Sequence, residues 1–413
     1  MKMWIFNHYA TNQYIDGTGR HQALAKYLIK MGHDVRIFCA DTIHNSNDLI
    51  DTENKLFTEK KGKDNVDYIF IKTCPYTGNG KARIKNMTLF WRRLPRVVNQ
   101  YIENEGKPDV FIASSVHPLT LVAGLSLKRK HNIPCICEIR DLWPESIVSY
   151  GQARETNPAI KILYKLEKYI YRKADRIVFT MAGGKQYIID KGWEKQIDLS
   201  KVRYICNGID GELYAQNITE NIILDSDLED DNSYKIVYAG SIRKADEAVP
   251  KLVNIAELLK QKELNDIKIL VYGDGDIRDE LVLECKRKGL MNIVFKGFVD
   301  KKYIPFILSK SNLNILNLTD NNILKYGGSQ NKLFEYLKSG KPILAGESNP
   351  FSIINQYKCG ISRKFNDNNE IVDAIQEIRN SNFDEDKIKN AADNFDFSYL
   401  AILLEKCIRE VVH

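Results

Sequence analysis

The segment Tyr326-Gly-Gly-Ser-Gln-Asn-Lys-Leu-Phe-Glu-Tyr-Leu-Lys-Ser-Gly-Lys-Pro342 carries the strongest structural signal in this sequence. Two glycines and a serine precede a run of helical spacing, and Gly340 followed by Pro342 marks the end of that helix. A glycine loop that opens into a helix presents free backbone N–H groups and the positive end of the helix dipole, which favour a phosphate or diphosphate. Glu335 lies one turn after Asn331, where its carboxylate could bind the hydroxyls of a ribose or a sugar. The segment therefore predicts a nucleotide or nucleotide-sugar site, with candidate donor-binding residues Gly327, Gly328, Ser329, Asn331, Lys332 and Glu335.

The chain of 413 residues is long enough for two domains, and its 44% hydrophobic and 28% charged residues are typical of a folded protein. Short apolar strands alternate with helical patterns in both halves, which predicts an α/β fold of two doubly wound, Rossmann-like units with parallel sheets. We expect strands at Met3–Asn7, Asp34–Ala40, Tyr68–Lys72, Asp109–Ser114, Pro134–Ile139, Arg176–Thr180, Val202–Cys206, Lys235–Ala239, Ile267–Tyr272, Asn292–Phe295, Leu313–Asn317, Pro342–Ala345 and Gly360–Lys364.

Turn and loop signals predict the domain boundaries. Asn207-Gly-Ile-Asp210 closes the first unit with a turn, and the acidic stretch Leu224–Ser233 is typical of a loop. We therefore expect an N-terminal domain at 1–206, a linker at 207–234 and a C-terminal domain at 235–390. The remaining residues, 391–413, contain apolar positions at helical spacing, which predicts a terminal helix.

Charge, cysteine content and the length of apolar runs indicate the cellular location and the kind of binding partner. The net charge of +6 is far below that of a strongly basic nucleic-acid binder, so we expect no nucleic-acid partner. Eight scattered cysteines without zinc-site spacing indicate buried thiols in a reducing cytosol. No apolar run reaches the roughly 20 residues that a spanning helix needs. The expected location is cytoplasmic, with any membrane contact peripheral.

The most basic stretch, Lys81–Arg96, interleaves Phe90 and Trp91 with arginines and lysines. Aromatic rings at the headgroups and cations on anionic lipid would suit the inner face of the cytoplasmic membrane. An ordinary helix with a basic face explains the same pattern. The sequence leaves both interpretations open.

Two turns in the second half are further candidates for donor binding. The strand Lys235–Ala239 runs into Gly240, which lets the backbone approach a diphosphate, and Arg243 and Lys244 supply charge. An ordinary surface loop is the alternative. Gly273 and Gly275 could line the nucleotide cleft, and the aspartates beside them are expected to serve turn and cap geometry rather than to bind a metal.

Three places in the first half offer polar groups at strand or turn ends. His117 follows the strand Asp109–Ser114, where open sheets bind ligands, and could contact a sugar hydroxyl or stabilise a transition state; a capping or packing histidine is the alternative.

In Glu138-Ile-Arg-Asp-Leu-Trp-Pro-Glu-Ser146, Asp141 or Glu145 could position or deprotonate an acceptor hydroxyl, and Arg140 could hold a phosphate. A structural ion-pair cluster around Trp143 explains that stretch equally well. The turn at Gly17, Gly19 and Arg20 lacks the third glycine of a dinucleotide fingerprint, which argues against a dinucleotide site and leaves a plain glycine-rich turn as one interpretation.

Several of these stretches resemble a known family. Ser329–Pro342 resembles the donor-site motif of the family-4 retaining glycosyltransferases, which have the GT-B fold, and Ser-Ser-x-His-Pro around His117 resembles another form frequent among them. Arg140–Ser146 resembles a signature of their bacterial L-fucosamine-transferase-like branch. The resemblance implies two Rossmann-like domains facing a central cleft, a terminal helix crossing back to the first domain, and donor binding without a metal. It also implies that the glycine loop with Gly17, Gly19 and Arg20 lies by the donor diphosphate and the acceptor. Glu335 matches the second glutamate of the family's Glu-x7-Glu pair, whereas Gly327 stands at the first.

The hypothesis that follows is a retaining hexosyl or N-acetylaminosugar transferase without cofactor or metal. It would move a sugar from a UDP-linked donor to a hydroxyl of a lipid-linked saccharide in cell-surface polysaccharide synthesis, such as O-antigen or capsule. Its candidate catalytic residues are His117, Asp141 and Glu145. Two alternatives stay open: a sugar-nucleotide epimerase or hydrolase of the same fold, and a non-catalytic nucleotide-sugar-binding protein.

Overall fold

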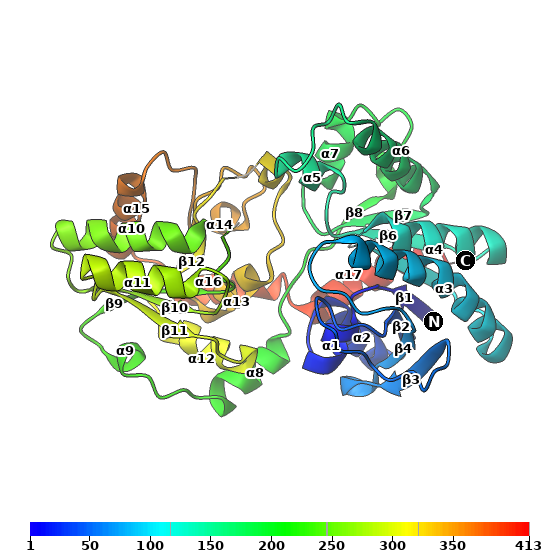
Figure 1. Ribbon diagram of the computed structural model, residues 1–413, viewed down its shortest axis with the longest axis horizontal. Helices are drawn as coiled ribbons and strands as arrows, with labels where there is room; N and C mark the ends of the chain where they lie inside the picture. The colour runs from blue at the N-terminus through cyan, green and yellow to red at the C-terminus, as the bar shows by residue number, and fades with distance from the viewer. Residues whose placement is uncertain (116, 245–246, 321, 413) are drawn as a thin grey trace. The chain divides into compact units, whose positions relative to one another are not determined.

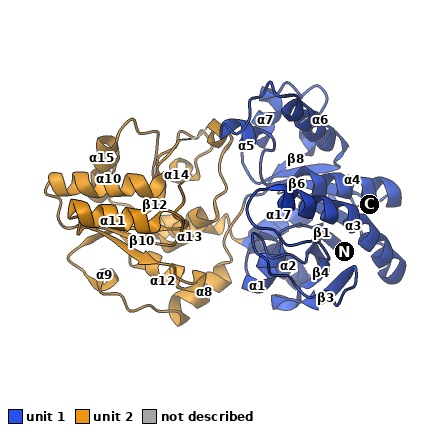
Figure 2. Ribbon diagram, in the orientation of Figure 1, with its two compact units in different colours: residues 1–206, 397–413 blue, residues 207–396 orange. Residues whose placement is uncertain are grey.

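The computed structural model describes residues 1–115, 117–244, 247–320 and 322–412, and it divides into two compact units (Figures 1 and 2). Unit 1 comprises Met1–Cys206 together with Phe397–His413, and unit 2 comprises Asn207–Asp396. Each unit is a sheet of mainly parallel strands with helices packed on its faces, as expected for a doubly wound α/β fold (Figure 1).

Within its described residues, unit 1 contains an eight-stranded sheet in the order β3-β4-β2-β1-β5-β6-β7-β8. All pairs are parallel except β3 with β4, which is antiparallel. The strands are β1 (Lys2–Phe6), β2 (Asp34–Ala40), β3 (Phe57–Lys61), β4 (Asp67–Ile71), β5 (Val110–Ser114), β6 (Cys135–Ile139), β7 (Arg176–Phe179) and β8 (Val202–Tyr204).

The helices of unit 1 include the terminal helix of the chain. They are α1 (Thr11–Asp16), α2 (Arg20–Lys30), α3 (Lys81–Glu105), α4 (Pro118–His131), α5 (Glu145–Ser149), α6 (Pro158–Lys173), α7 (Gly184–Asp190) and α17 (Phe397–Arg409). Ion pairs hold the C-terminal segment to this unit: His33 Nε2 lies 3.0 Å from Glu405 Oε1, and Arg203 Nη2 lies 2.6 Å from Glu410 Oε2.

Unit 2 contains, among its described residues, a six-stranded parallel sheet in the order β11-β10-β9-β12-β13-β14. The strands are β9 (Tyr234–Ala239), β10 (Ile267–Tyr272), β11 (Ile293–Gly297), β12 (Leu313–Asn317), β13 (Ile343–Ala345) and β14 (Gly360–Ser362). The helices are α8 (Gly211–Glu220), α9 (Ser226–Glu229), α10 (Ala248–Gln261), α11 (Arg278–Lys288), α12 (Ile304–Ser309), α13 (Asn331–Ser339), α14 (Ile353–Gln356), α15 (Asn368–Asn380) and α16 (Glu385–Asp393).

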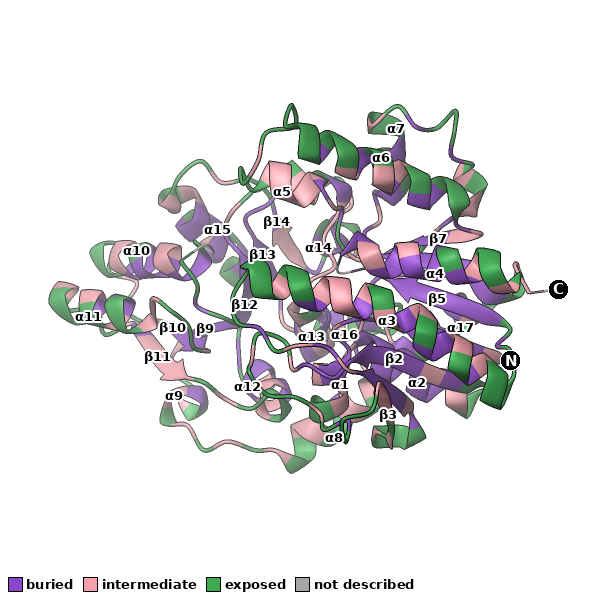
Figure 3. Cartoon of the chain, turned by 45° about the vertical axis from the view of Figure 1, so that its right-hand side comes forward, coloured by how far each residue is buried: buried purple, intermediate pink, exposed green. Residues whose placement is uncertain are grey.

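The strands form the core because their apolar residues are covered on both faces. Trp4, Ile5 and Phe6 of β1 are fully buried, as are Ile236 and Val237 of β9. Strands covered on both faces have continuous apolar runs rather than an alternating pattern, which is what made them recognisable in the sequence. Figure 3 shows this burial along the strands, with the outer faces of helices such as α6 exposed.

Every strand expected from the sequence coincides with a strand of the structure, and the differences lie elsewhere. The sequence did not predict β3, because Phe57–Lys61 is mostly polar. An edge strand pairs on one side only, so its residues need not be apolar. The segment 207–234, expected as a linker, belongs to unit 2 and contains α8 and α9. The acidic stretch expected as a loop therefore includes a short helix, started by the Asp225 side chain, which accepts a hydrogen bond from the Asp227 N–H.

Each sheet has one point where the strand order reverses, and this point fixes where a ligand can bind. In unit 1 the reversal lies between β1 and β5, and in unit 2 it lies between β9 and β12. Crevices at the carboxyl ends of such neighbouring strands are where open α/β sheets bind ligands. His8 and His117 follow the two strands of unit 1, and Gly240 and the Gly327–Ser329 loop follow those of unit 2.

Candidate active site

The N-terminus of α13 is open to a ligand. Its first residues form no side-chain cap, and Gly340 at φ 79° ends the helix in the left-handed conformation. Among the described residues, no group accepts a hydrogen bond from the backbone N–H of Gly328, Ser329, Gln330 or Asn331. Free N–H groups at the positive end of a nine-residue helix are a suitable site for a phosphate.

The loop before α13 is held in place from one side. The Asn207 N–H donates to Ser329 Oγ at 2.7 Å, and Asn207 Nδ2 donates to the Ser329 carbonyl at 2.7 Å. Gly327 has φ 90°, a conformation that strains any residue with a side chain. A glutamate at this position would therefore disturb the loop that presents the free N–H groups.

Arg243 and Lys244 come from the neighbouring strand. Both side chains are exposed in the loop after β9, and neither contacts a carboxylate among the described residues. Helix α13 touches the end of the same strand, because Tyr336 Oη accepts a hydrogen bond from the Ala239 N–H at 3.0 Å and Lys332 Nζ lies 4.4 Å from the Tyr238 ring. The cationic loop and the open helix terminus thus belong to one edge of the unit 2 sheet.

The close packing of two loops requires glycine at positions 273 and 275. A Cβ at Gly273 would lie 1.8 Å from the Gly240 carbonyl oxygen, and one at Gly275 would lie 1.9 Å from the Ile242 carbonyl oxygen. The Gly240 N–H also donates to the Tyr272 carbonyl at 2.9 Å. Both glycines let the loops after β9 and β10 run against each other, and their expected role in lining a nucleotide cleft stays a prediction.

The Asp-x-Asp beside these glycines accepts hydrogen bonds from backbone N–H groups of the two loops, but it does not cap α11, whose N-cap is Ile277 without a side-chain hydrogen bond. Asp274 Oδ1 accepts a hydrogen bond from the Gly275 N–H at 2.8 Å, and Asp276 Oδ1 accepts one from the Lys244 N–H at 3.0 Å. Within the described ranges of the chain, no three His, Cys, Asp or Glu side chains are grouped as a metal site. Asp276 thus fixes the backbone at Lys244.

Glu335 lies on α13 as a carboxylate with spare acceptor capacity. Lys301 Nζ is 3.6 Å from its Oε1, and the Glu335 side chain is 16% exposed. Burial raises the pKa of Glu335, and the nearby Lys301 opposes that shift. A partly desolvated carboxylate with one weakly placed cation can still accept hydrogen bonds from the hydroxyls of a ligand.

In unit 1 the reversal point carries two histidines in contact. His8 Nδ1 lies 2.7 Å from His117 Nε2, and the His8 ring is stacked between Tyr9 and Phe90 with centroids 4.3 and 4.5 Å away. His117 is the N-cap residue of α4, yet its side chain forms no cap hydrogen bond. The contact with His8 therefore replaces the capping role that the sequence left open.

Both rings are neutral, and His117 keeps one unused atom. Burial and the neighbouring His117 hold the pKa of His8 well below its usual value, and burial with the charge of Arg83 lowers the pKa of His117 to about 3. His117 Nδ1 is buried and has no hydrogen-bond partner among the residues that the structure describes. Such an atom is costly to leave unpaired, so a ligand hydroxyl there would gain a hydrogen bond.

Arg140 and Asp141 follow β6 next to this pair of strands. The Arg140 N–H donates to Ser115 Oγ at 2.9 Å, and its buried side-chain Nε has no hydrogen-bond partner among the described residues. Burial lowers the pKa of Arg140, and the negative charges of Glu138 and Asp141 oppose that shift. Asp141 is exposed and its carboxylate has no hydrogen-bond donor in the described chain. Both side chains are available to a ligand.

Glu145, expected as a catalytic candidate, already has two partners. Tyr164 Oη donates to its Oε2 at 2.6 Å, and Lys191 Nζ lies 2.6 Å from the same oxygen. The Lys191 amine also lies 4.2 Å from the centre of the Tyr164 ring. These contacts match the structural ion-pair alternative for this carboxylate, and they tie α5 to α6 and α7.

Gly17, Gly19 and Arg20 also have partners other than a ligand. Gly17 and Gly19 make the left-handed turn between α1 and α2, with φ 60° and 116°. Gln13 Oε1 then accepts hydrogen bonds from the His21 and Gln22 N–H groups at 2.9 and 3.1 Å, so this helix terminus is capped.

Arg20 is 4% exposed, and its guanidinium is occupied within unit 1. Its Nε and Nη2 donate to Glu138 Oε2 at 2.9 and 2.7 Å, and its other hydrogen bonds go to the carbonyls of Ile205 and Cys206. The family resemblance made Arg20 a candidate for donor binding, but in this structure the buried Glu138 binds its guanidinium.

Two residues at these sheet edges were not expected from the sequence. His8 was missed because no motif surrounds it, and it becomes visible only through its contact with His117. Phe298, which follows β11 in unit 2, is 73% exposed. An exposed aromatic ring at the carboxyl edge of a sheet could stack on a nucleotide base; the isolated position after a glycine gives no such signal in the sequence.

Comparisons with known proteins agree with this architecture. A family model described as Glycosyltransferase Family 4 matches residues 15–213, and one described as Glycosyl transferases group 1 matches residues 233–381. No curated protein matches the chain in sequence. Together the two models match most of the chain, which therefore belongs to the glycosyltransferases that they describe.

Solved structures share the fold over the whole chain. Anabaena HepE in complex with UDP is 13% identical, with a TM-score of 0.66 over 99% of this chain and 100% of that chain. A glycosyltransferase from Rickettsia africae is 14% identical, with a TM-score of 0.63 over 99% and 98%. The lipopolysaccharide outer core galactosyltransferase WaaB is 13% identical, with a TM-score of 0.61 over 99% of each chain. The fold is the GT-B fold of two Rossmann-like domains.

The structure bears on membrane contact through its helices. Among the described residues, none of the helices combines the length and the apolar character that crossing a bilayer requires. Helix α3, which carries the basic stretch, has Lys85, Arg92 and Arg96 exposed, whereas Phe90 is fully buried against His8. The expectation that Phe90 contacts lipid headgroups is therefore wrong, because that ring is part of the core of unit 1.

Proposed function

We propose that this glycosyltransferase is a retaining enzyme that transfers a sugar from a UDP-linked donor to a hydroxyl of a lipid-linked saccharide in cell-surface polysaccharide synthesis. Within the family, the Arg140–Ser146 stretch supports the L-fucosamine-transferase-like branch. The open N-terminus of α13, beside two exposed cations, is the observation that carries the proposal. Anabaena HepE, which shares the fold, was crystallised with UDP and with UDP-glucose.

Unit 2 holds the donor in this proposal. The diphosphate accepts hydrogen bonds from the free N–H groups of Gly328 and Ser329, and Arg243 and Lys244 compensate its charge. Negative charge increases on the diphosphate as the bond to the sugar breaks, so dipoles and cations already in place stabilise the transition state more than the bound substrate. Glu335 accepts hydrogen bonds from the ribose hydroxyls. No metal is needed for these contacts.

Unit 1 supplies a neutral histidine to the transferred sugar in this proposal. His117 Nδ1 forms a hydrogen bond with a sugar hydroxyl, and His8 fixes the orientation of the ring. Asp141 positions the acceptor hydroxyl, whose proton passes to the departing phosphate as the new glycosidic bond forms on the same face of the sugar. This order of events retains the anomeric configuration without a covalent intermediate on the protein.

Replacing Glu335 by alanine tests the donor site. We expect the affinity for UDP to fall by about tenfold to a hundredfold, since hydrogen bonds to a charged group are worth about 1.5–3 kcal/mol. Isothermal titration calorimetry with UDP measures the change, and Glu377→Ala, at an exposed glutamate of α15, is the matched control. Unchanged affinity in Glu335→Ala would remove the ribose role. Turnover of the donor to free sugar or an epimer without acceptor would favour the hydrolase or epimerase alternative.

The lipid-linked acceptor predicts attachment to an anionic membrane through α3. Exchanging Lys85 and Arg92 for glutamate should lower binding to vesicles with phosphatidylglycerol by at least about tenfold, because each cation near such a surface contributes about 1 kcal/mol. Sedimentation with the vesicles measures the bound fraction. The control, Lys286→Glu with Arg287→Glu on α11, changes the net charge equally on another exposed helix. Equal losses in both variants would argue against a specific membrane face.

A further inference from the structure

The two ring nitrogens of His8 have different surroundings. Nδ1 lies 2.7 Å from His117 Nε2, whereas Nε2 is buried and has no hydrogen-bond partner of good geometry among the described residues. Tyr9 and Phe90 stack on the ring, with centroids 4.3 and 4.5 Å away, so only its edge can form hydrogen bonds. The group at the Nε2 edge therefore decides which nitrogen of His8 holds the proton.

Asn86 of α3 is the polar residue next to this edge. It lies one helical turn before Phe90 on the same face of the helix, and its side chain is fully buried. Asn86 Oδ1 is also buried without a partner of good geometry in the part of the chain that the structure describes. Burial and the neighbouring His117 lower the pKa of His8, and hydrogen bonding to Asn86 opposes them. Asn86 is thus within reach of the His8 ring.

The other end of the Asn86 amide is fixed by three oxygens. Nδ2 donates to the Cys74 carbonyl at 2.6 Å and to the hydroxyl oxygens of Thr42 and Thr73 at 2.9 and 3.1 Å. A carbonyl oxygen can only accept, so Cys74 assigns Nδ2 to this end of the amide. The Thr73 hydroxyl itself donates to Asp41 Oδ1 at 2.7 Å, which leaves its oxygen to accept from Asn86. Oδ1 is therefore the free end of the amide, and it can only accept.

We propose that Asn86 is a positioning residue that sets the tautomers of both histidines. Asn86 Oδ1 accepts from the His8 Nε2–H, so His8 Nδ1 carries no proton and accepts from the His117 Nε2–H. His117 Nδ1, the buried atom without a partner among the described residues, then presents a lone pair rather than an N–H. In the opposite arrangement His8 Nε2 and Asn86 Oδ1 would be two acceptors with no proton between them, and His117 Nδ1 would be a donor.

The tautomer decides how His117 acts on the transferred sugar, and this step rests on the proposed function. A sugar hydroxyl must donate to His117 Nδ1, because a bare nitrogen can only accept. Donation leaves more electron density on the hydroxyl oxygen, which stabilises the positive charge that develops on the sugar as its bond to the diphosphate breaks. An N–H at the same place would do the opposite. Because the pKa of His117 is about 3, the ring holds this hydroxyl without taking its proton.

Nitrogen NMR of the free protein with isotopically labelled histidine tests the assignment without any ligand. A bare ring nitrogen and a protonated one resonate far apart, and the variants His8→Ala and His117→Ala assign the signals among the seven histidines. In the wild type we expect a protonated Nε2 and a bare Nδ1 in both rings. In Asn86→Leu, which keeps the size of the side chain but removes its acceptor, the signals of both rings should move to the reversed tautomer or to a mixture.

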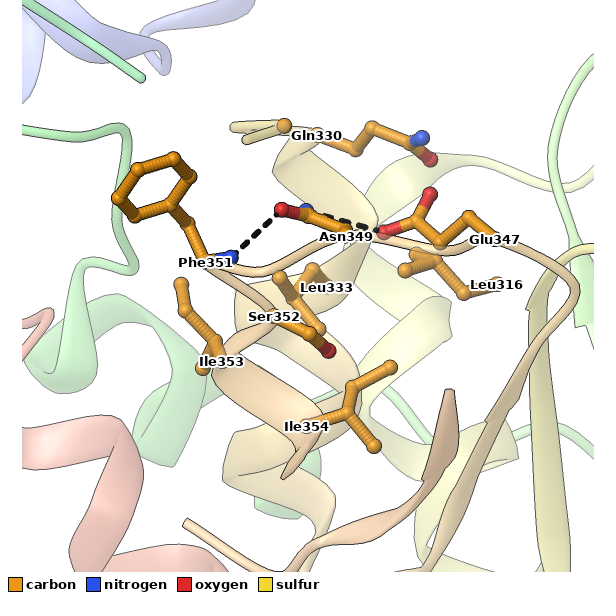
Figure 4. Close-up of a pocket in the computed structure, with 10 residues that line it drawn as sticks. Leu316, Gln330, Leu333, Glu347, Asn349, Phe351, Ser352, Ile353 and Ile354 are labelled. Atoms are coloured by element: carbon orange, nitrogen blue, oxygen red, sulfur yellow. Dashed lines mark hydrogen bonds between the residues drawn. The ribbon is translucent and has the colours of Figure 1, made fainter. Parts of the chain in front are cut away.

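Two variants control for general effects of the substitution. Thr42→Val removes a hydroxyl from the same cluster, but Cys74 still holds the Asn86 amide, so the tautomers should stay as in the wild type. Asn349→Leu makes the same exchange in unit 2, where the Asn349 amide accepts from the Phe351 N–H at 2.8 Å (Figure 4). It should leave both histidines unchanged. Circular dichroism spectra establish that all variants are folded.

The sugar contact has its own test on the same labelled protein. UDP-glucose should move the His117 Nδ1 signal upfield, as happens when a bare nitrogen accepts a hydrogen bond, whereas UDP should leave it in place. In Asn86→Leu this displacement should shrink, because part or all of His117 Nδ1 is then protonated. Calorimetry with UDP and UDP-glucose establishes that both ligands are bound.

The outcomes separate this inference from the proposed function. A protonated His117 Nδ1 in the wild type, or wild-type tautomers in folded Asn86→Leu, would overturn the role of Asn86. Bound UDP-glucose that leaves the His117 signal in place would overturn the contact with the sugar. Failure of the wild type to bind UDP would overturn the proposed function, while the tautomers measured in the free protein would still decide the role of Asn86.

Discussion

Replacing His117 by alanine should lower kcat by roughly 10²- to 10⁴-fold, the range for a positioned proton-transfer or hydrogen-bonding group. The ring sits where β5 ends and keeps Nδ1 unpaired, so its contact with the reacting sugar is lost in the variant. UDP affinity should change little, because the nucleotide is held by residues of unit 2. Steady-state kinetics with saturating donor, together with calorimetry on UDP, measures both quantities.

The histidine pair offers controls for this experiment. His8→Ala should lower kcat less than His117→Ala, because His8 only orients the second ring. His131→Ala, at the last residue of the same helix α4, should leave kcat unchanged, since that ring bonds to Asn99 Oδ1 at 2.6 Å. Since the pKa of His117 is about 3, its protonation should not contribute to the pH dependence of kcat near neutrality. Full turnover by His117→Ala would refute its assignment.

Replacing Glu138 by alanine should cost about 3–5 kcal/mol of the stability of unit 1. Glu138 is 1% exposed and binds Arg20 through Oε2 and His21 through Oε1, so its removal leaves a buried guanidinium without a counter-charge. The four tryptophans, Trp4, Trp91, Trp143 and Trp193, all lie in unit 1. Their fluorescence during urea unfolding therefore reports this unit separately from the other.

The double variant Arg20→Met with Glu138→Leu is the matched control. Removing both charges leaves none unpaired, so it should be more stable than Glu138→Ala alone. If Glu138→Ala unfolds at the same urea concentration as the wild type, the pair contributes nothing to the fold.

The same pair makes stability depend on pH in a defined direction. Burial alone would raise the pKa of Glu138, but Arg20 and His21 outweigh it and hold the pKa well below the usual value. A carboxylate with a depressed pKa in the folded state stabilises the protein above the pKa of the unfolded chain, roughly 4.3. That contribution is lost as the pH falls from there through the folded-state pKa, and Glu138→Ala should lack this part of the acid transition.

The fold could be predicted because its signals are local. A buried parallel strand is a short apolar run, and a helix that ends at Gly340 is marked by the glycine itself. β3 escaped because its residues are polar and pair on one side only. The 207–234 segment was misread because acidic residues that cap short helices look like those of a loop; Asp210 and Asp225 both accept hydrogen bonds from helix N–H groups.

The site was predictable only where one segment makes it. The Gly327–Ser329 loop and the helix that follows it are contiguous in the chain, so the sequence alone predicts a helix N-terminus with free N–H groups. Partners distant in sequence cannot be read in this way: Arg20 lies 118 residues from Glu138, and His8 lies 109 residues from His117.

The central claim is that the open N-terminus of α13 holds the diphosphate of a nucleotide donor, and a crystal structure of the chain with UDP tests it most directly. The account predicts diphosphate oxygens within hydrogen-bond distance of the Gly328 and Ser329 N–H groups, Arg243 or Lys244 beside them, and the ribose hydroxyls on Glu335. Density for UDP at another place, such as the α2 N-terminus with Gln13 displaced, would contradict it.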